Sequence, residues 1–513
     1  MQTQTTRLTT ASITAPLFMT DCYKVGHKEI YPAGTTKVLS NYTNRASRLE
    51  GVRKVVHFGL QAFLQSYCVE AFEPFFAAEE AHAVAEYNQR LTEVLGVEHG
   101  IDTTHIAELH KLGYLPLIFR SLPEGTRVPL RVPSFTIENT LPEFFWLTNY
   151  IETVLSAEIW QASTSATTAD TYRTVLDRAA ERTGGDPAGV NWQLHDFSFR
   201  GMGGAHAAAM SGAGHLLSFT GSDSLATIDW VNRYYPSEFG SENGLVIGSI
   251  PATEHSVMCA GISEANELET FRRILNIHPR GNVSVVSDTF DLWKVLLEIL
   301  PALKDQIMVR EGKLVIRPDS GDPADIICGS KSGPENTEPV GDRTLETDPA
   351  FFGAIQILWN VFGGTINDAG FKVLDPHIGL IYGDSITVER AKDITQRLET
   401  MGFSASNIVL GVGSYTYQYV TRDTFSSAIK ATWVEIDGVG HDLLKDPITD
   451  SGMKKSATGR LAVLTDENGE LVLIEKASAE DEARSLLRPV WADGKFVATQ
   501  SFADVRAVLG NLR

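Results

Sequence analysis

The chain has 513 residues, of which 43% are hydrophobic and 21% charged, a composition typical of a globular protein with two or three domains. Its 44 basic and 64 acidic residues give a formal net charge of −20, which argues against nucleic-acid binding because that function needs a basic face. It contains no run of about 18 apolar residues, the length that a membrane-spanning helix needs, so we expect no membrane partner.

The amino-terminal residues 1–14 are rich in threonine and lack the apolar core of a signal peptide, so we expect a flexible tail. The four cysteines are far apart and form neither a CxxC pair nor a metal-ligand spacing: Cys22, Cys68, Cys259 and Cys328. We therefore expect no disulfide framework, and a reducing compartment, the cytoplasm, is the predicted location.

The two ends of the chain contain candidate antiparallel structure. Near the amino end a helical pattern over 142–160 follows a candidate strand region over 126–140. Near the carboxyl end, three segments carry an Asp-Gly or Asn-Gly turn between apolar runs, which predicts β-hairpins: 433–444, 459–476 and 490–497.

Between residues 190 and 425, short apolar runs end in Asp, Ser, Gly, His or Arg, and a helical pattern often follows. The runs are 192–197, 216–223, 245–256, 283–291, 314–322, 378–385 and 407–414. This repetition predicts parallel βα units, with a polar surface loop inserted at 330–349. Because functional residue types end every run, a closed barrel is favoured over an open doubly wound sheet.

The ends of these runs offer a consistent chemistry. They carry carboxylates, arginines, one histidine and glycine turns: Asp196, Asp223, Asp288, Asp319, Asp384, Arg200, Arg317, His255, Gly383, Gly411 and Gly413. Glycine turns and arginines suit phosphate oxygens, whereas carboxylates suit ribose hydroxyls or a magnesium ion. The set predicts a phosphorylated sugar and a divalent metal, whose ligands the sequence does not identify.

Each residue also has a structural interpretation. His255 alone is more often structural than catalytic, Arg317 fits a buried ion pair, and Asp288, Asp319 and Asp384 each fit a helix N-cap. The functional interpretation therefore depends on all of them standing at equivalent positions. Two phosphate signatures are missing, GxxxxGK[ST] and a strand–GxGxxG–helix unit, which argues against a P-loop ATPase and a dinucleotide fold.

A series of motifs in order resembles the nicotinamide phosphoribosyltransferases, from about residue 15 to the carboxyl end. The motifs are TDCYKVGH (20–27), LHDFSFRG (194–201), GSDS (221–224), PATEHS (251–256), SVVSD (284–288), IRPDSG (316–321), YGD (382–384), TRD (421–423) and KDP (445–447). The resemblance implies the type II phosphoribosyltransferase fold, an irregular α/β barrel with a second, β-rich α+β domain, and a homodimer. The barrel is then expected at 166–425 and the second domain at 15–165 with 426–513.

The resemblance also implies a reaction and its participants. Nicotinamide and phosphoribosyl pyrophosphate would give nicotinamide mononucleotide and pyrophosphate, with Mg²⁺ as cofactor and ATP as co-substrate. Phe197 and Tyr23, the latter from the partner subunit, would stack on the pyridine ring. Asp223 would accept from the carboxamide and so favour nicotinamide over nicotinate. Arg200 and Arg317 would line the base and phosphate pocket.

The resemblance also implies which residues bind the ribose and the phosphates. Asp319, Gly383 and Asp384 would hold the ribose, and Gly413, Ser414 and Arg422 the 5′-phosphate. Arg45, Lys430 and Lys454 would surround the pyrophosphate and ATP phosphates, Arg45 coming from the partner subunit. The phosphate turn reads GVGSYTY here, where relatives carry a more glycine-rich run.

In the family the histidine matching His255 is phosphorylated by ATP, a fit role for an imidazole that is neutral near pH 7. Asp288 is the candidate for holding the other ring nitrogen, and Glu254 is expected to assist or to cap the loop. Two alternatives remain: nicotinate phosphoribosyltransferase, which shares the fold and the histidine, and a metal-dependent barrel hydrolase. Neither HxH nor HExxH spacing occurs to support the hydrolase.

Overall fold

The computed structural model describes residues 12–237, 246–261, 263–330, 344–383, 385–446 and 455–512. Asp384, Lys454, most of the expected tail 1–14 and most of the expected loop 330–349 lie outside these ranges. Two compact units divide the chain. The first takes its residues from 1–164, 232–242 and 421–509, and the second from 165–231, 243–420 and 510–513.

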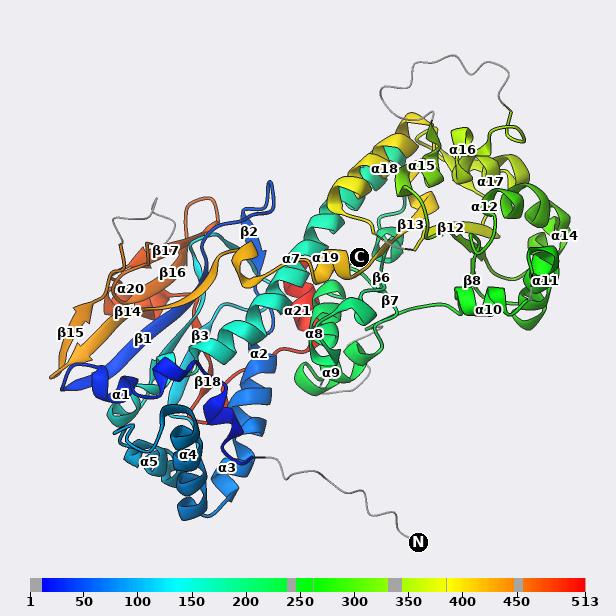
Figure 1. Ribbon diagram of the computed structural model, residues 1–513. Helices are drawn as coiled ribbons and strands as arrows, with labels where there is room; N and C mark the ends of the chain where they lie inside the picture. Colours follow the sequence, from blue (N-terminus) through cyan, green and yellow to red (C-terminus); the bar gives the residue numbers. More distant parts are fainter. Residues whose placement is uncertain are drawn as a thin grey trace, which may run out of the picture. The chain divides into compact units, whose positions relative to one another are not determined.

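The first unit is built on a seven-stranded antiparallel sheet in the order β15-β14-β1-β5-β3-β18-β19 (Figure 1). Its strands are β1 (Thr35–Asn44), β3 (Leu117–Ser121), β5 (Pro133–Asn139), β14 (Ser427–Ile436), β15 (Val439–Asp442), β18 (Arg488–Ala492) and β19 (Lys495–Phe496). Two small pairs accompany it: β2 (Lys54–Val56) with β4 (Arg127–Pro129), and β16 (Leu461–Thr465) with β17 (Leu471–Glu475). The pairing of β1 with β14 brings the two ends of the chain into one sheet.

The three hairpins expected in the carboxyl-terminal segments are confirmed. At Asp437-Gly438, φ is 51° and 76°, and at Asp493-Gly494 it is 48° and 80°. Two consecutive left-handed residues define the type I′ turn, whose twist matches that of the flanking strands. The third turn, at Gly469, closes with a bond from its N–H to the carbonyl of Asp466.

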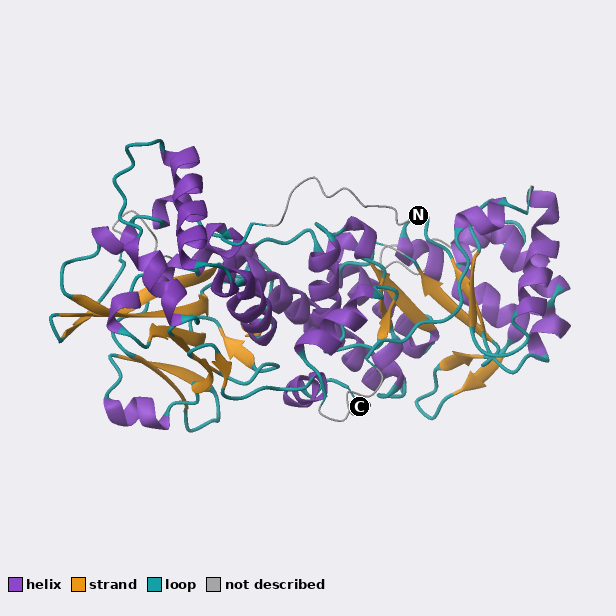
Figure 2. Cartoon of the chain, turned by 90° about the horizontal axis from the view of Figure 1, so that it is seen from below, coloured by secondary structure: helices purple, strands orange, loops and turns teal. Residues whose placement is uncertain are grey.

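Helices accompany this sheet (Figure 2), and several of them share an apolar core with it. They are α1 (His27–Ile30), α2 (Leu60–Phe63), α3 (Glu73–Ala77), α4 (Glu80–Leu95), α5 (Thr104–Leu112), α6 (Leu147–Tyr150), α20 (Ala479–Arg484) and α21 (Phe502–Leu509). The long helix α7 (Glu152–Thr183) and helix α9 (Ala226–Tyr234) contribute residues to both units. None of the described helices is long and apolar enough to span a bilayer.

The second unit contains a curled, wholly parallel sheet in the order β7-β6-β13-β12-β9-β8. Its strands are β6 (Leu194–Asp196), β7 (Gly221–Ser222), β8 (Val283–Val286), β9 (Leu314–Arg317), β12 (Ile378–Tyr382) and β13 (Ile408–Val412). Segment 248–252 links the two edges, because Gly248 bridges Gly221 and Ala252 bridges Ser284. The expected irregular α/β barrel is confirmed, and the bridged segment 248–252 stands where a strand was expected.

Helices surround this sheet, and a small hairpin joins β10 (Gly364–Ile366) to β11 (Lys372–Leu374). The helices are α8 (Ala205–His215), α10 (His255–Cys259), α11 (Glu267–Ile277), α12 (Leu292–Lys294), α13 (Leu300–Ala302), α14 (Lys304–Met308), α15 (Pro323–Cys328), α16 (Pro349–Phe352), α17 (Ala354–Phe362), α18 (Val388–Thr400) and α19 (Ser414–Tyr417). Figure 1 shows α15, α17 and α18 grouped beside β12 and β13.

Helix α18 illustrates why these segments fold as they do. The Thr387 hydroxyl caps its first turn by accepting from the N–H of Arg390, and Gly402 follows its end with φ of 75°. Ile394 and Leu398 recur at helical spacing and are fully buried. Each such aliphatic side chain contributes about 1.5–3 kcal/mol on burial, so its apolar stripe holds the helix against the sheet.

Candidate active site

A cavity of about 240 Å³ lies inside the curled sheet of the second unit. Phe197, Asp223 and Arg317, from the carboxyl ends of β6, β7 and β9, line it together with Ser249 of the bridging segment. The cavity also touches Lys313, which precedes β9. The carboxyl ends of parallel strands are where barrel enzymes place their reacting groups, so this cavity is the candidate base site.

Phe197 follows β6 and is fixed by a bond of 2.8 Å from its N–H to the carbonyl oxygen of Val412 on the neighbouring strand. The guanidinium carbon of Arg317 lies 5.0 Å from the centroid of its ring, a cation–π contact. An aromatic ring held in this way is suited to stacking on a planar heterocycle. Arg200, by contrast, lies on an exposed turn outside the residues that line the cavity.

Asp223 follows β7 and receives two hydrogen bonds on one oxygen. Ser249 Oγ donates to Oδ1 at 2.5 Å, and His195 Nε2 lies 3.0 Å from the same atom. Burial raises the pKa of Asp223, but these two donors and the charge of Arg317 outweigh it and hold the pKa below its ordinary value. The carboxylate is therefore ionised at neutral pH and can only accept hydrogen bonds.

Asp196, expected among the ligand-binding carboxylates, is fully buried instead. Its carboxylate accepts from the N–H of Ser198 and from the hydroxyl of Ser224, both at 2.8 Å, while its carbonyl accepts from the N–H of Asp223 at 3.0 Å. Asp196 therefore ties together the two loops that carry Phe197 and Asp223, and its charge is used within the fold.

His255 begins helix α10 and lies beside two carboxylates. Its Nε2 is 3.1 Å from Asp319 Oδ1, and its Nδ1 is 3.1 Å from the Thr289 hydroxyl. Asp288, expected to hold the ring, does not hydrogen-bond it in the structure, because its Oδ2 accepts from the N–H of Asp319 and the hydroxyl of Ser320. Asp319 therefore takes the place predicted for Asp288.

The second oxygen of Asp288 sets this cluster apart. Oδ1 is buried and has no hydrogen-bond partner among the described residues. Ligand atoms of His255, Asp288 and Asp319 all lie within 4.8 Å of one another. A buried carboxylate oxygen without a donor is costly unless a cation or proton compensates it, and paired carboxylates suit a hard divalent cation. The cluster can therefore hold a metal ion.

Glu254 precedes His255 as the N-cap residue of α10. Its carboxylate accepts from the hydroxyl of Ser256. Its side chain bonds neither the His255 ring nor the first backbone N–H groups of α10, so its only hydrogen bond among the described residues is the one from Ser256.

Gly383 lets the ends of β9 and β12 lie close together. Its N–H donates to the carbonyl of Pro318 at 2.9 Å, and a Cβ on it would stand 2.8 Å from the Cβ of Asp319. Only a glycine fits at this approach. Asp384, the next residue, lies outside the described residues.

Gly413 and Ser414 follow β13, where Ser414 begins the one-turn helix α19. Two tyrosines of this turn, Tyr415 and Tyr419, are exposed and stack with ring centroids 4.8 Å apart. The turn that follows β13 is therefore accompanied by an exposed aromatic stack.

The remaining predicted residues belong to the first unit. Arg45 and Lys430 line a cavity of about 200 Å³ there, together with Arg131 and Lys455, neither of which was predicted. Burial, followed by the charges of Arg45 and Lys445, lowers the pKa of Lys430, and Glu152 opposes this effect. A buried lysine close to further cations indicates a place suited to an anion. Lys454 lies outside the described residues.

Tyr23 and Arg422 also lie in the first unit and are exposed at the surface. Tyr23 is 66% exposed, and its hydroxyl donates to Asp21 at 3.1 Å. Arg422 contacts the neighbouring carboxylate of Asp423 at 3.3 Å. Both side chains are free to rearrange toward a ligand at little cost.

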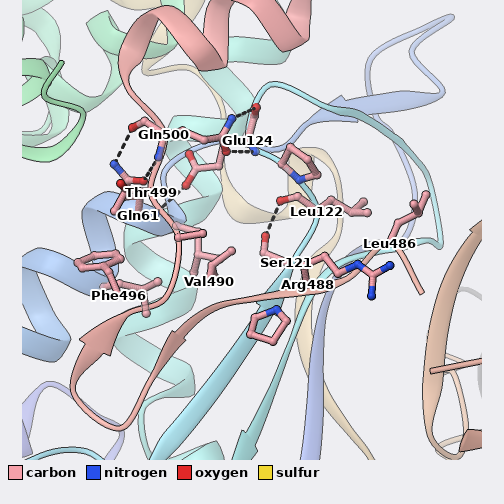
Figure 3. A pocket seen from close by; sticks show the side chains of 15 residues that line it. Gln61, Ser121, Leu122, Glu124, Leu486, Arg488, Val490, Phe496, Thr499 and Gln500 are labelled. Atoms are coloured by element: carbon pink, nitrogen blue, oxygen red, sulfur yellow. Dashed lines mark hydrogen bonds between the residues drawn. The ribbon is translucent and has the colours of Figure 1, made fainter. Parts of the chain in front are cut away.

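A larger cavity of the first unit, about 290 Å³, has a different character (Figure 3). Gln61, Glu124 and Gln500 bond to one another across it, which closes the carboxyl-terminal segment onto the rest of the unit. Burial raises the pKa of Glu124, although backbone donors and Tyr235 oppose the rise. These polar groups satisfy each other, so they serve the fold.

The chain matches two family models. The nicotinate phosphoribosyltransferase (NAPRTase) family matches residues 192–495, and the N-terminal domain of nicotinamide phosphoribosyltransferase matches residues 15–112. A protein of Acinetobacter baylyi named nicotinamide phosphoribosyltransferase is 48% identical over 504 residues, which cover 96% of each chain. The chain belongs to the nicotinamide phosphoribosyltransferase family. It is therefore a pentosyltransferase, which excludes the barrel hydrolase.

Other relatives agree with this assignment. A protein of Mycoplasma pneumoniae with the same name is 37% identical over 459 residues, covering 86% of this chain and 94% of that one. A nicotinate-nucleotide pyrophosphorylase structure from Pyrococcus furiosus superimposes with a TM-score of 0.55 at 17% identity, covering 98% and 97% of the two chains. Human nicotinic acid phosphoribosyltransferase gives 0.52 at 16% identity, covering 96% and 93%. These two structures support the fold alone and confirm the predicted type II phosphoribosyltransferase fold.

Sequence reasoning missed several residues near the site. His195 and Ser249 bond Asp223, and Thr289 bonds His255. Each of these residues stands within or near one of the sequence motifs. Periodicity alone, however, does not predict which side chains meet across a sheet. Arg131 and Lys455 had no such signal beyond their charge.

Proposed function

We propose that this protein transfers the phosphoribosyl group of 5-phosphoribosyl 1-pyrophosphate to nicotinamide, releasing nicotinamide mononucleotide and pyrophosphate, as a step of NAD salvage. Family membership supports the reaction. One observation supports the choice of base, the ionised Asp223 in the cavity beside Phe197. An ionised carboxylate accepts from the N–H₂ of nicotinamide and repels the carboxylate of nicotinate.

In this reaction the pyridine nitrogen bonds to the anomeric carbon of the ribose as the bond to pyrophosphate breaks. Phe197 stacks on the pyridine and sets its plane, while Asp223 sets its rotation within that plane. Holding the nitrogen in line with the anomeric carbon converts binding into a rate gain by positioning. The remaining charge must be carried by the groups around the ribose and the pyrophosphate.

The ribose and phosphate contacts follow the same proposal. Asp319, Gly383 and Asp384 hold the ribose, where carboxylates accept from hydroxyls and tolerate positive charge on the ring. Gly413, Ser414 and Arg422 bind the 5′-phosphate through backbone N–H groups and a guanidinium. Arg317 lines the base pocket, and Arg200, on its exposed turn outside the cavity, is assigned to the phosphate side.

Mg²⁺ is included as a cofactor because the His255 cluster fits it. The unpartnered, buried Oδ1 of Asp288 and the carboxylate of Asp319 are hard oxygen ligands of the kind magnesium prefers. Asp288 and Asp319 would hold the ion. When bound, it would stabilise negative charge on the leaving pyrophosphate.

ATP is included as a co-substrate that phosphorylates His255. A ring nitrogen takes the terminal phosphoryl group of ATP, ADP leaves, and hydrolysis of the phosphohistidine later releases phosphate and restores the imidazole. Both ring nitrogens are hydrogen-bonded in the structure, to Asp319 and to Thr289, so one of these contacts must open first. The remaining contact orients the ring and stabilises the charged intermediate.

The proposal extends to a cytoplasmic homodimer with shared active sites. Tyr23 of the partner subunit stacks on the second face of the pyridine. Arg45, Lys430 and Lys454 bind the pyrophosphate and ATP phosphates, with Arg45 also supplied by the partner subunit. The exposure of Tyr23 and the basic cavity at Arg45 support this assignment. The four cysteines are all free, as expected in a reducing compartment.

The test is a competition assay. Purified protein receives phosphoribosyl pyrophosphate and magnesium with equal amounts of nicotinamide and nicotinate, with and without ATP, and the products are separated by chromatography. Nicotinamide mononucleotide, formed faster with ATP, is the expected result. Nicotinate mononucleotide would overturn the role of Asp223, and no transfer at all would overturn the proposed reaction.

A further inference from the structure

The carboxylate of Asp223 is held on one side only. Both donors reach Oδ1, Ser249 from its hydroxyl and His195 from Nε2. Because an ionised carboxylate carries no proton, His195 must be the tautomer with hydrogen on Nε2. Oδ2 has no hydrogen-bond partner within the described part of the chain. One oxygen is thus saturated, and the other remains an acceptor.

The strand order explains why the two donors meet at this oxygen. Strand β7, which ends one residue before Asp223, lies between β6 and the bridging segment. His195 pairs with Gly221 on one side, and Gly248 bridges Gly221 on the other. Strand β6 on one side of β7 and the bridging segment on the other therefore each supply one donor, and the Asp223 side chain is held between them.

His195 links this carboxylate to the aromatic ring of the site. Its ring lies against Phe197 with centroids 4.6 Å apart and planes tilted by 33°. His195, Phe197, Asp223 and Ser249 all line the same cavity. The His195 imidazole thus contacts both Phe197, which would stack on the base, and Asp223, which would bind the carboxamide of the base.

We propose that His195 and Ser249 are positioning residues that set the choice of pyridine base by occupying one oxygen of Asp223 and leaving the other as a fixed acceptor. This rests on the proposed function. A carboxylate with both oxygens unbound turns about its side-chain torsion and presents no single acceptor direction. The two donors remove that freedom before the substrate arrives, which is preorganisation.

The donors also act on charge. Burial on its own raises the pKa of Asp223, and the bonds from His195 and Ser249 bring it below its ordinary value. Without them, burial favours the protonated form of Asp223 and the charge of Arg317 alone opposes it. A protonated carboxyl donates a hydrogen bond, and so it can accept nicotinate. Loss of either donor is therefore expected to admit the wrong base as well as to weaken the right one.

The experiment compares four variants of the full-length protein in the steady-state assay. Ser249→Ala removes the hydroxyl, and Ser249→Thr retains it. His195→Phe keeps a ring against Phe197 but cannot donate, and His195→Gln restores a donor. The control is His377→Phe, because His377 bonds Asp375 at 2.7 Å before β12, outside the cavity. KM and kcat are measured for nicotinamide and for nicotinate from neutral to weakly acidic pH, and thermal unfolding is followed for each variant.

We expect Ser249→Ala and His195→Phe each to lower the nicotinamide-to-nicotinate ratio of kcat/KM by about tenfold, mainly through the KM for nicotinamide. The ratio should fall further as the pH is lowered, earlier than in the wild type. Ser249→Thr and His195→Gln should recover most of it, and His377→Phe should not change it.

Two results would overturn the inference, and they are distinguishable. If the wild type prefers nicotinamide and both donor-removing variants keep that preference at every pH, the positioning role falls while the proposed function stands. If the wild type itself prefers nicotinate, the proposed function falls and the inference falls with it. Should His195→Phe unfold, the Ser249 pair decides the question alone.

Discussion

Two carboxylate sites in the second unit differ in how the protein compensates their negative charge. Around Asp223, the barrel supplies two donors to one oxygen and lowers the pKa of the carboxylate. Around His255, Asp288 and Asp319 stand within 4.8 Å of each other, and a buried oxygen of Asp288 has no partner among the described residues. At Asp223 the protein saturates one oxygen and leaves the other as an acceptor, whereas at Asp288 a buried oxygen has no donor among the described residues.

This difference separates recognition from catalysis. A group that reads one face of a neutral base works best when the protein has already fixed its geometry, because the substrate then adds little ordering cost. A carboxylate that binds a cation beside a pyrophosphate acts best when its negative charge is compensated only after these ligands have bound. Substitutions in the two groups should therefore fail in different ways.

The largest effect is expected at Asp288. Replacing it with asparagine (Asp288→Asn) removes the charge of the unpartnered oxygen at nearly constant volume. We expect kcat/KM to fall by about 100-fold or more, because a direct ligand of the proposed magnesium ion is lost. Magnesium titrations of the rate and of the thermal unfolding temperature would measure this, and the stabilisation by Mg²⁺ should largely vanish. Asp375→Asn, in a carboxylate that accepts from His377 elsewhere, is the control.

His255 should separate coupling from transfer. We expect His255→Ala to keep a slow transfer reaction and to lose its stimulation by ATP, a loss of roughly 5- to 150-fold at limiting substrate, the usual range for coupled binding events. Product formation is measured with and without ATP, and ADP release in parallel. Full ATP stimulation in this variant would contradict the phosphohistidine.

The fold was largely predictable from the chain, because strand ends and turns depend on local chemistry. Turns such as Asp437-Gly438 adopt the left-handed backbone that only a few residues tolerate. The regular strand expected over 245–256 reduces to single bridges, since Pro251 has no N–H to donate to a ladder. The helix expected over 142–160 is divided into a short turn at Pro142–Phe144, the one-turn helix α6 and the start of α7 at Glu152.

The site was predictable as a set of residues and less so as a set of contacts. Asp288 and Asp319 follow adjacent strands at equivalent places, so spacing cannot decide which one reaches His255. The structure decides it through the N–H of Asp319, which occupies Asp288. Likewise, the buried carboxylate of Asp196 accepts from the hydroxyls of Ser222 and Ser224, which belong to a different motif on the neighbouring strand. Such choices depend on side-chain packing across strands, which no one-dimensional pattern contains.

Asp223 should also leave a pH signature in stability. Because its pKa is lowered in the folded state, its contribution is present above the ordinary carboxyl pKa of about 3.9 and is lost as the pH falls through the folded value. The stability difference between wild type and Asp223→Asn should therefore be constant near neutral pH and shrink in acid. Its side chain is 43% exposed, so we expect less than about 1 kcal/mol. Denaturant unfolding at several pH values would measure it, and a difference that grows in acid would contradict the assignment.

The smallest effect concerns the first unit, where Arg131 lines the basic cavity in a left-handed conformation with φ of 72°. A residue with a Cβ spends about 1–2 kcal/mol on that backbone, and glycine does not. Arg131→Gly should therefore raise the unfolding temperature by about 1 °C, since the greater flexibility of glycine in the unfolded chain offsets most of the gain.

The same change removes a cation from the cavity, so pyrophosphate should bind about 2- to 5-fold more weakly, the scale of an exposed charge contact. Calorimetric titration with inorganic pyrophosphate measures the affinity. Arg131→Lys keeps both the charge and the strained backbone, and it should leave both quantities close to the wild type. If Arg131→Gly raises the unfolding temperature and weakens pyrophosphate binding, then the charge of Arg131 contributes to binding while its strained backbone lowers stability. A gain in stability with unchanged affinity would show that Arg131 acts only as a turn residue and would leave Arg45, Lys430 and Lys455 as the cations that bind the anion.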